Sequence, residues 1–77
     1  MKELLYAIVE RLVTDSSAIR ITEDAVNEEG VTVLHLSVAA DDMGRVIGKQ
    51  GRIAKAIRTL MRAGAAREGL KVVVEID

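Results

Sequence analysis

The spacing of apolar residues changes between a helical and a strand period along the chain, and the order of these periods limits the folds that the sequence can adopt. Near the start, apolar residues recur every three or four positions, which is typical of an amphipathic helix. Two segments rich in β-branched residues follow, then helical spacing returns, and a third β-branched segment completes the pattern. The predicted elements are a helix at 2–14, strands at 19–22 and 31–39, helices at 43–47 and 51–66, and a strand at 70–76.

This order predicts an α+β fold, a two-layer sandwich in which three helices back a three-stranded sheet. The last strand follows two helices, so it joins the sheet through a crossover and makes the sheet parallel or mixed. The pattern leaves the order of the strands open. Leu34, Leu36 and Val38 share one face of the second strand and are expected to face the core. Because the chain is short and has no cysteine, we expect residues 1–77 to form a single domain held by apolar packing.

The charges are divided between two parts of the sequence, although the net charge of the chain is only −1. Residues 1–43 hold three basic and nine acidic side chains, a net charge of −6, whereas residues 44–71 hold eight basic and one acidic, a net charge of +7. Such a domain can present one positive face to a polyanion despite its acidic pI, while the simpler alternative is a solvated basic helix face. The residues expected on the polar side of the long helix are Lys55, Arg58, Thr59 and Arg62.

Gly48 and Gly51 interrupt the basic helical region and bracket two polar residues. Glycine at both positions permits a sharp turn between helices and a close approach of a ligand to the backbone. The next helix begins with N–H groups that lack intrahelical partners and carry the positive end of the helix dipole, so a phosphate is the natural ligand. One alternative is a glycine corner without a ligand. A P-loop is excluded because three residues instead of four separate Gly44 from Gly48, and Gln50 stands where Ser or Thr is needed.

The segment Ile47-Gly48-Lys49-Gln50-Gly51, within VIGKQGRIAKAIRTL, resembles the I-G-x-x-G motif of the KH RNA-binding domain. The order of elements is similar to that of type II KH domains, over all 77 residues. A free-standing domain of this size is similar to the small bacterial KhpA family of KH proteins. The resemblance implies a groove that holds about four nucleotides of single-stranded RNA or DNA, with the G-x-x-G loop gripping their backbone.

The residues that the resemblance assigns to RNA form the loop, its flanking cations and the apolar floor of the groove. The last strand, from Lys71 to Glu75, and the turn at 27–30 are expected to form the opposite wall. Tyr6 is the only aromatic residue, so bases would rest on aliphatic side chains, and we expect weak, modestly selective binding. The predicted RNA-binding residues are Arg45, Ile47, Gly48, Lys49, Gln50, Gly51, Arg52, Ile53, Ala54, Lys55 and Lys71.

A second hypothesis is a protein-interaction adaptor with little direct RNA binding. We expect the apolar arc of the helix at 51–66 to exceed what one sheet face covers, and a small domain gains stability by dimerising. KhpA-like proteins are RNA chaperones that self-associate or pair with a larger KH-containing protein, so the resemblance implies a homodimer or such a heterodimer. Dimerisation would compete with RNA where the two sets of residues overlap. The candidate dimer residues are Ile53, Ala54, Ile57 and Met61.

No set of residues indicates catalysis. His35 is the only histidine and has no acidic or thiol partner near it in sequence, so we expect a structural role. Asp41 and Asp42 lack a third metal ligand, and helix capping accounts for them. We therefore expect no enzymatic activity, metal, cofactor or small-molecule substrate. No apolar run suits a membrane span or a signal peptide, which leads us to expect a cytoplasmic protein.

Overall fold

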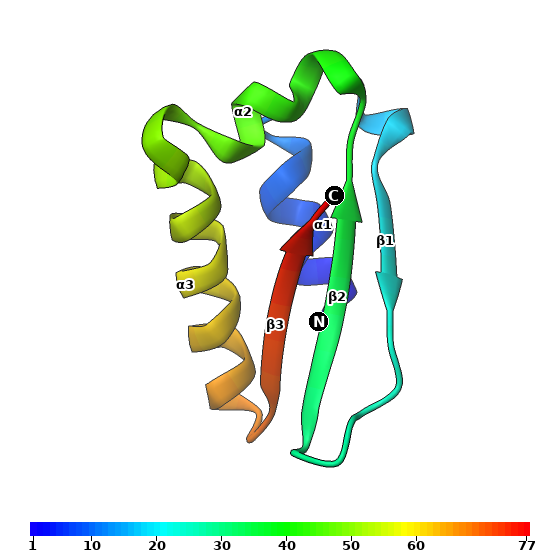
Figure 1. Ribbon diagram of the computed structural model, residues 1–77, viewed down its shortest axis with the longest axis vertical. Coiled ribbons are helices and arrows are strands. Elements are labelled where there is room, and N and C mark those ends of the chain that lie inside the picture. The colour runs from blue at the N-terminus through cyan, green and yellow to red at the C-terminus, as the bar shows by residue number, and fades with distance from the viewer.

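The computed structural model describes residues 1–77, and its elements follow the order predicted from periodicity (Figure 1). Short 3₁₀ turns at Ser16–Ala18, Ala40–Asp42 and Lys49–Gly51 connect the longer elements. The helices and strands are α1 (Lys2–Glu10), β1 (Arg20–Glu23), β2 (Val31–Ser37), α2 (Met43–Ile47), α3 (Arg52–Arg67) and β3 (Lys71–Ile76).

The three strands form one mixed sheet in the order β1-β2-β3. β1 pairs antiparallel with β2, with Arg20 opposite Ser37, and β2 pairs parallel with β3, with Leu34 opposite Val74. The parallel pair requires a crossover, which α2 and α3 provide. α1 lies behind the sheet and α3 runs beside β3 (Figure 1). The structure is therefore the two-layer α+β sandwich expected from the sequence.

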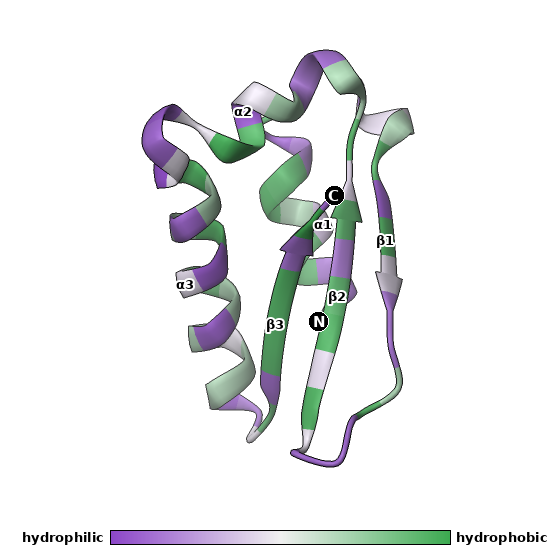
Figure 2. Ribbon diagram, viewed as in Figure 1, coloured by the Kyte–Doolittle hydropathy of each residue, from purple (hydrophilic) through white to green (hydrophobic).

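The core lies between the sheet and the helices. Leu34 and Leu36 on β2 are fully buried, and Val38 is partly buried against the same core, which confirms the predicted core face. Figure 2 shows the alternation of hydrophobic and polar residues along β2, whereas β3 is mostly hydrophobic. The apolar core consists of Leu5, Val9, Ile19, Leu34, Leu36, Val46, Ile57, Met61 and Val74.

The first helix is shorter than predicted, because α1 ends at Glu10 and not at residue 14. The next apolar residues, Leu12 and Val13, still pack against the core, although they lie beyond the end of the helix. Apolar spacing therefore identified Leu12 and Val13 as core-facing but not the end of the helix, because a turn can place the same side chains on the same surface. Leu4, which shares the apolar spacing, is 40% exposed.

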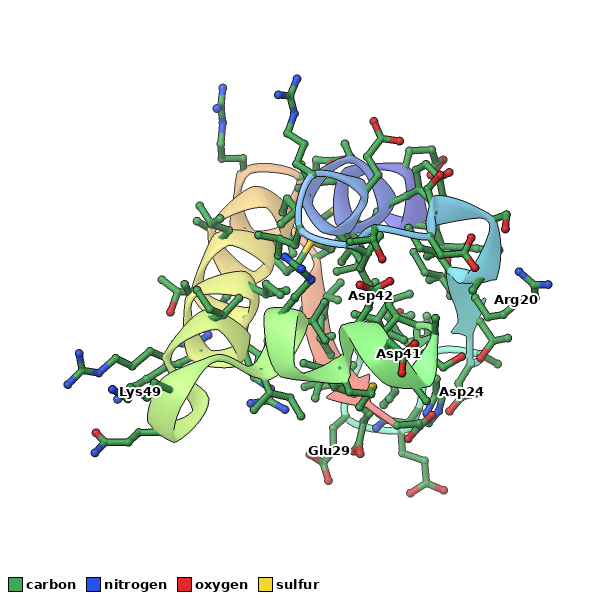
Figure 3. The ribbon with its side chains drawn as sticks, turned by 90° about the horizontal axis from the view of Figure 1, so that it is seen from above. Arg20, Asp24, Glu29, Asp41, Asp42 and Lys49 are labelled. Carbon is green, nitrogen blue, oxygen red and sulfur yellow. The ribbon has the colours of Figure 1, made fainter.

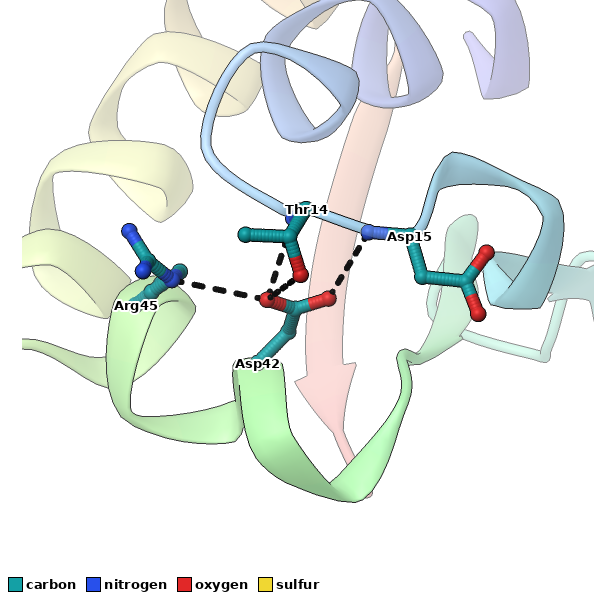
Figure 4. A network of polar contacts seen from close by, with 4 residues as sticks. All are labelled: Thr14, Asp15, Asp42 and Arg45. Carbon is teal, nitrogen blue, oxygen red and sulfur yellow. Dashed lines mark hydrogen bonds and ion pairs between the residues drawn. The ribbon is translucent and has the colours of Figure 1, made fainter.

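Asp42 joins the segment that follows α1 to the start of α2 (Figure 4). Its Oδ1 accepts hydrogen bonds from the backbone N–H and the hydroxyl of Thr14, and its Oδ2 accepts one from the N–H of Asp15, at 3.0, 2.9 and 3.1 Å. Nε of Arg45 lies 3.5 Å from Oδ1. Asp42 is only 1% exposed, and the hydrogen bond from the Thr14 backbone is the main reason why its pKa is lowered.

The prediction that Asp41 or Asp42 caps the next helix is wrong. No side chain accepts a hydrogen bond from the first turn of α2. Asp42 stands at the N-cap position, but its backbone is helical (φ −98°, ψ −5°), whereas a capping residue needs an extended backbone for its side chain to reach the first turn. The carboxylate of Asp42 instead bonds to a segment 28 residues earlier in the chain.

His35 on β2 has acidic neighbours that the sequence did not reveal. Its Nε2 lies 2.9 Å from Oδ2 of Asp24, and its Nδ1 lies 3.8 Å from Oδ2 of Asp77. Asp24 follows β1 and Asp77 follows β3, so the imidazole connects all three strands. The hydrogen bond with Asp24 raises the pKa of His35, and the negative charges of Asp24, Asp77 and Glu75 act in the same direction.

Candidate nucleic-acid interface

The glycine loop connects α2 to α3 in a tight turn. α2 ends at Ile47, and Gly48 adopts φ 75° and ψ 175°. Gln50 and Gly51 both have left-handed backbones, with φ 58° and 74°. The N–H of Gly51 donates a hydrogen bond to the carbonyl oxygen of Gly48 at 3.2 Å. The two glycines therefore bracket a sharp turn, as expected from their spacing.

The side chains of the loop are exposed and have no partners in the molecule. Lys49, Gln50 and Arg52 make no hydrogen bond or ion pair through their side chains. Figure 3 shows Lys49 extending outward at the edge of the molecule, on the side away from Arg20 and Asp24. Positive charge thus stands in solvent with no acidic side chain beside it to neutralise it.

The first turn of α3 adds backbone donors to this charge. α3 spans 16 residues and follows Gly51, and no side chain caps its first turn. The N–H groups of Gly51 and Arg52 are already bonded, to the carbonyl oxygens of Gly48 and Lys49. The N–H groups that follow in the first turn of a helix have no intrahelical acceptor, and they carry the positive end of the helix dipole. Together with Lys49 and Arg52, these groups form a site suited to an anion such as a phosphate.

Arg45 differs from the other predicted cations because it has an acidic partner. Its Nε lies 3.5 Å from Oδ1 of Asp42, although 58% of the Arg45 side chain is exposed. The Asp42 carboxylate is negatively charged at neutral pH, since its pKa lies below the usual 3.8. Part of the charge of Arg45 is therefore already balanced, so we expect Arg45 to contribute less to anion binding than Lys49.

The three residues predicted to line the floor differ in accessibility. Ile47 and Ile53 flank the loop and are 39% and 36% exposed, so a ligand can touch them. Ala54 is only 4% exposed and faces the interior of the domain. The accessible apolar surface beside the loop therefore consists of Ile47 and Ile53.

The two predicted lysines outside the loop lie at different ends of α3. Lys55 is exposed in the first turns of the helix, near the loop. Lys71 begins β3, four residues after α3 ends, so it lies at the far end of the helix (Figure 1). A helix of this length spans about 24 Å. The structure therefore brings Lys55 to the loop but leaves Lys71 far from it.

Arg58 contacts β3, which sequence reasoning missed by placing it with the solvated side chains of the helix. Its Nε donates a hydrogen bond to the carbonyl oxygen of Val74 at 3.2 Å. Arg58 follows Ala54 by four residues, so both lie on the flank of α3 that faces β3. The sequence could not identify this flank, because alanine occurs on both sides of the helix and the pattern does not show which alanine is buried.

The candidate dimer residues are mostly inside the domain. Ala54, Ile57 and Met61 are 4%, 2% and 0% exposed, because this stripe of α3 packs against the sheet, so these three side chains are not a surface of the structure. Ile53 remains accessible. The exposed apolar residues of α3 follow one stripe of the helix, which runs from Ile53 beside Gly48 to the position of Gly64, where Leu4 of α1 makes contact. We call this surface the apolar flank; it consists of Leu4, Ile53, Ala56 and Leu60.

The structure holds little else that resembles a functional site. No three His, Cys, Asp or Glu side chains gather closely enough to hold a metal ion. None of the helices combines the length and apolarity that crossing a lipid bilayer requires.

A three-stranded mixed sheet in this order, with a G-x-x-G loop between two helices of the crossover, defines the class of the protein as a type II KH domain.

The family follows from comparison with known proteins. The family model described as "KhpA/KhpB, KH domain" matches residues 2–76, and the chain belongs to this family. Proteins named RNA-binding protein KhpA from Clostridium acetobutylicum and Clostridium perfringens are each 51% identical over 76 residues, covering 99% of this chain and 99% of theirs. The protein of the same name from Listeria monocytogenes is 46% identical, covering 99% of this chain and 97% of its own.

The fold also resembles part of a larger solved protein. A crystal structure of Aquifex aeolicus Era, the Y63A variant bound to GDP and aluminium fluoride, matches with a TM-score of 0.67 and 18% sequence identity. The match covers 96% of this chain, which spans only 28% of the Era chain. At this identity the likeness concerns the fold alone.

Proposed function

We propose that this protein binds single-stranded RNA through the G-x-x-G loop and the first turn of α3. The observation that carries the proposal is the exposed loop, in which Lys49, Gln50 and Arg52 are without partners beside an uncapped helix N-terminus. Relatives at 42 to 51% identity are named RNA-binding proteins, which supports RNA as the ligand. We infer that residues 1–77 act as one KH domain and not as an enzyme.

The proposed contact is chiefly with the sugar-phosphate backbone. A phosphate at the loop accepts hydrogen bonds from backbone N–H groups and pairs with Lys49, while Ile47 and Ile53 support a base. A KH groove holds about four nucleotides. The site has no aromatic side chain, so no base can stack on a ring, an interaction that raises the affinity of many proteins for single strands. Weak binding to many sequences suits an RNA chaperone.

A charge reversal at the loop tests the proposal. We expect the double variant Lys49→Asp, Gln50→Asp to lose most of its affinity for a single-stranded oligonucleotide, because it puts two carboxylates where the phosphate binds. Aspartate tolerates the left-handed backbone of position 50, so the fold should persist.

The matched control is Arg11→Asp, Ser16→Asp, which changes the net charge by the same amount at exposed positions away from the loop. Fluorescence anisotropy measures binding, and circular dichroism checks the fold. Equal affinities of the loop variant and the control would contradict the proposal.

A second function, self-association or pairing with another KH-containing protein, is favoured by the apolar flank. Leu4 and Leu60 are 40% and 54% exposed, and exposed apolar side chains that lie together are typical of a protein-interaction surface. Leu60 and Arg58 stand two positions apart, about 200° around the helix, so they lie on opposite flanks of α3. Association through the apolar flank therefore leaves the side of α3 that faces β3 open, but Ile53 belongs both to this flank and to the surface beside the loop, so the two functions compete there.

A further inference from the structure

The edge of β3 that faces α3 carries unpaired backbone groups. β3 is the last strand of the sheet and pairs only with β2. Backbone groups of successive residues point alternately to the two sides of a strand. The N–H of Asp77 donates to the carbonyl of Leu36 on β2 at 2.8 Å, which fixes this alternation. The residues whose backbone groups point away from β2 are therefore Val72, Val74 and Ile76.

Arg58 is anchored to this edge. Its Nε donates to the carbonyl oxygen of Val74, and the side chain of Val74 is held in the core at 3% exposure, so the acceptor is fixed in position. No carboxylate pairs with Arg58. The guanidinium group is therefore oriented by a neutral backbone acceptor, and its positive charge remains unbalanced.

The terminal nitrogens of Arg58 are free to bind a ligand. A guanidinium group has five N–H donors in a rigid planar fork and no acceptor. The bond to Val74 uses the donor on Nε, which leaves the four donors on Nη1 and Nη2. Because Arg58 is an exposed residue, these donors are accessible from solvent. The result is an oriented surface of donors beside the free strand edge.

Arg58 also lies within reach of a strand that starts at the loop. It follows Arg52, the first residue of α3, by six residues, which is about 9 Å along the helix axis. A strand of about four nucleotides, at roughly 3.4 Å each even when stacked, covers this distance. A base of a strand held at the loop can therefore lie over the space between Arg58 and β3.

We propose that Arg58 reads one base in this space and selects bases that present two adjacent hydrogen-bond acceptors. The inference rests on the proposed RNA-binding function. Guanine presents O6 and N7 to a guanidinium fork, and cytosine presents O2 and N3 on its Watson–Crick edge. Adenine and uracil offer no two adjacent acceptors on their Watson–Crick or Hoogsteen edges, because the amino group of adenine and the N3–H of uracil stand beside the acceptors there, so the fork can bond to only one of them.

The test compares four eight-nucleotide single-stranded RNAs: oligo-U, oligo-A, oligo-C and a UG repeat. We expect the protein to bind oligo-C or the UG repeat about fivefold or more tightly than oligo-U and oligo-A, and these two arms separate cytosine from guanine. Arg58→Ala should bind all four with similar affinity. Arg58→Lys keeps the charge but lacks the fork, so it should also lose the preference while retaining its affinity for oligo-U.

Arg62→Ala is the matched control, because Arg62 is an exposed arginine one turn further along α3 that bonds to nothing in the structure. It should weaken binding to all four RNAs equally and leave the preference unchanged. If Arg58→Ala behaves in the same way, or if the unmodified protein shows no preference, the inference about Arg58 is wrong even though loop-dependent binding persists. Binding that is unaffected by the loop charge reversal would instead overturn the proposed function.

Discussion

Gly48 lies directly against Ile53, with no room for a side chain between them. A Cβ built on Gly48 would stand 2.9 Å from both the Cβ and the backbone nitrogen of Ile53, and it would also overlap Cγ1. The backbone of Gly48, at φ 75° and ψ 175°, lies in a region that is almost exclusive to glycine. Packing and backbone conformation therefore both require glycine at this end of the loop.

Replacing Gly48 by alanine should destabilise the protein and disturb the loop. The backbone strain alone costs about 1–3 kcal/mol, and the overlap with Ile53 adds to it. Gly44→Ala is the matched control, because a Cβ there meets nothing within 4 Å and alanine favours the helix. Urea unfolding should show a loss of stability for Gly48→Ala and none for Gly44→Ala. Equal stabilities of the two variants would refute this account of the loop.

Asp42→Asn should lower the melting temperature, by roughly 10 °C or more, because an amide cannot accept all the hydrogen bonds that Thr14 and Asp15 donate. The native pKa of Asp42 is lowered from the usual 3.8, so its stabilisation is complete above that pH and is lost as the pH falls through the native pKa. The difference between the two proteins should therefore shrink in strong acid. Thermal unfolding from pH 7 to pH 2 measures this, with the exposed neighbour variant Asp41→Asn expected to match the unmodified protein.

His35 should titrate above its usual pKa of 6.5, because Asp24 stabilises the protonated imidazole. Its stabilising contribution is complete below pH 6.5 and disappears as the pH rises through the native value. Since His35 is the only histidine, its imidazole signals in a proton NMR titration are unambiguous. Asp24→Asn should shift the titration toward 6.5, whereas Glu23→Gln at the adjacent position should shift it much less. A native pKa at or below 6.5 would contradict the contact.

Leu60→Asp should convert any dimer into a monomer, because it places a charge in the middle of the apolar flank. Analytical ultracentrifugation gives the mass in solution. Val26→Asp is the control, since Val26 is even more exposed, at 65%, but lies in the turn between β1 and β2. A dimer that survives Leu60→Asp would show that another surface joins the copies.

RNA binding should weaken as the salt concentration rises, and the steepness of this dependence should report how many phosphates the protein contacts. Each neutralised phosphate of a single strand contributes about −0.7 to the slope of log K against log salt concentration, so two or three contacts give about −1.5 to −2. Lys49→Ala should reduce the magnitude of the slope by about 0.7, while Lys2→Ala should leave it unchanged. A slope near zero would indicate that phosphates contribute little to binding.

The order of elements and the position of the loop could be predicted because both depend on local chemistry. Alternation placed Leu34 and Leu36 in the core, and the two glycines marked the turn between helices. The buried and exposed faces of α3 were harder to predict, because Ile53 and Ile57 are chemically alike. Only the packed structure shows that Ile53 is exposed and Ile57 is buried.

Contacts between distant segments could not be predicted. The carboxylate of Asp42 precedes a helix, and helix capping is the local explanation, yet its partner Thr14 lies 28 residues away. The bond from Arg58 to Val74 likewise depends on the placement of β3 at the edge of the sheet. Neither contact can be recognised from the spacing of residue types along the sequence.

The opposition of Leu60 and Arg58 on α3 determines what a pair of such domains can do. Two copies related by a two-fold axis through the apolar flank would carry two outward-facing grooves on one rigid body. Once one groove holds a transcript, the second meets a nearby stretch of the same strand at a high effective concentration, so the avidity of the pair can greatly exceed the affinity of either copy. Two binding sites that are each weak would then be enough to hold one RNA strand folded back on itself.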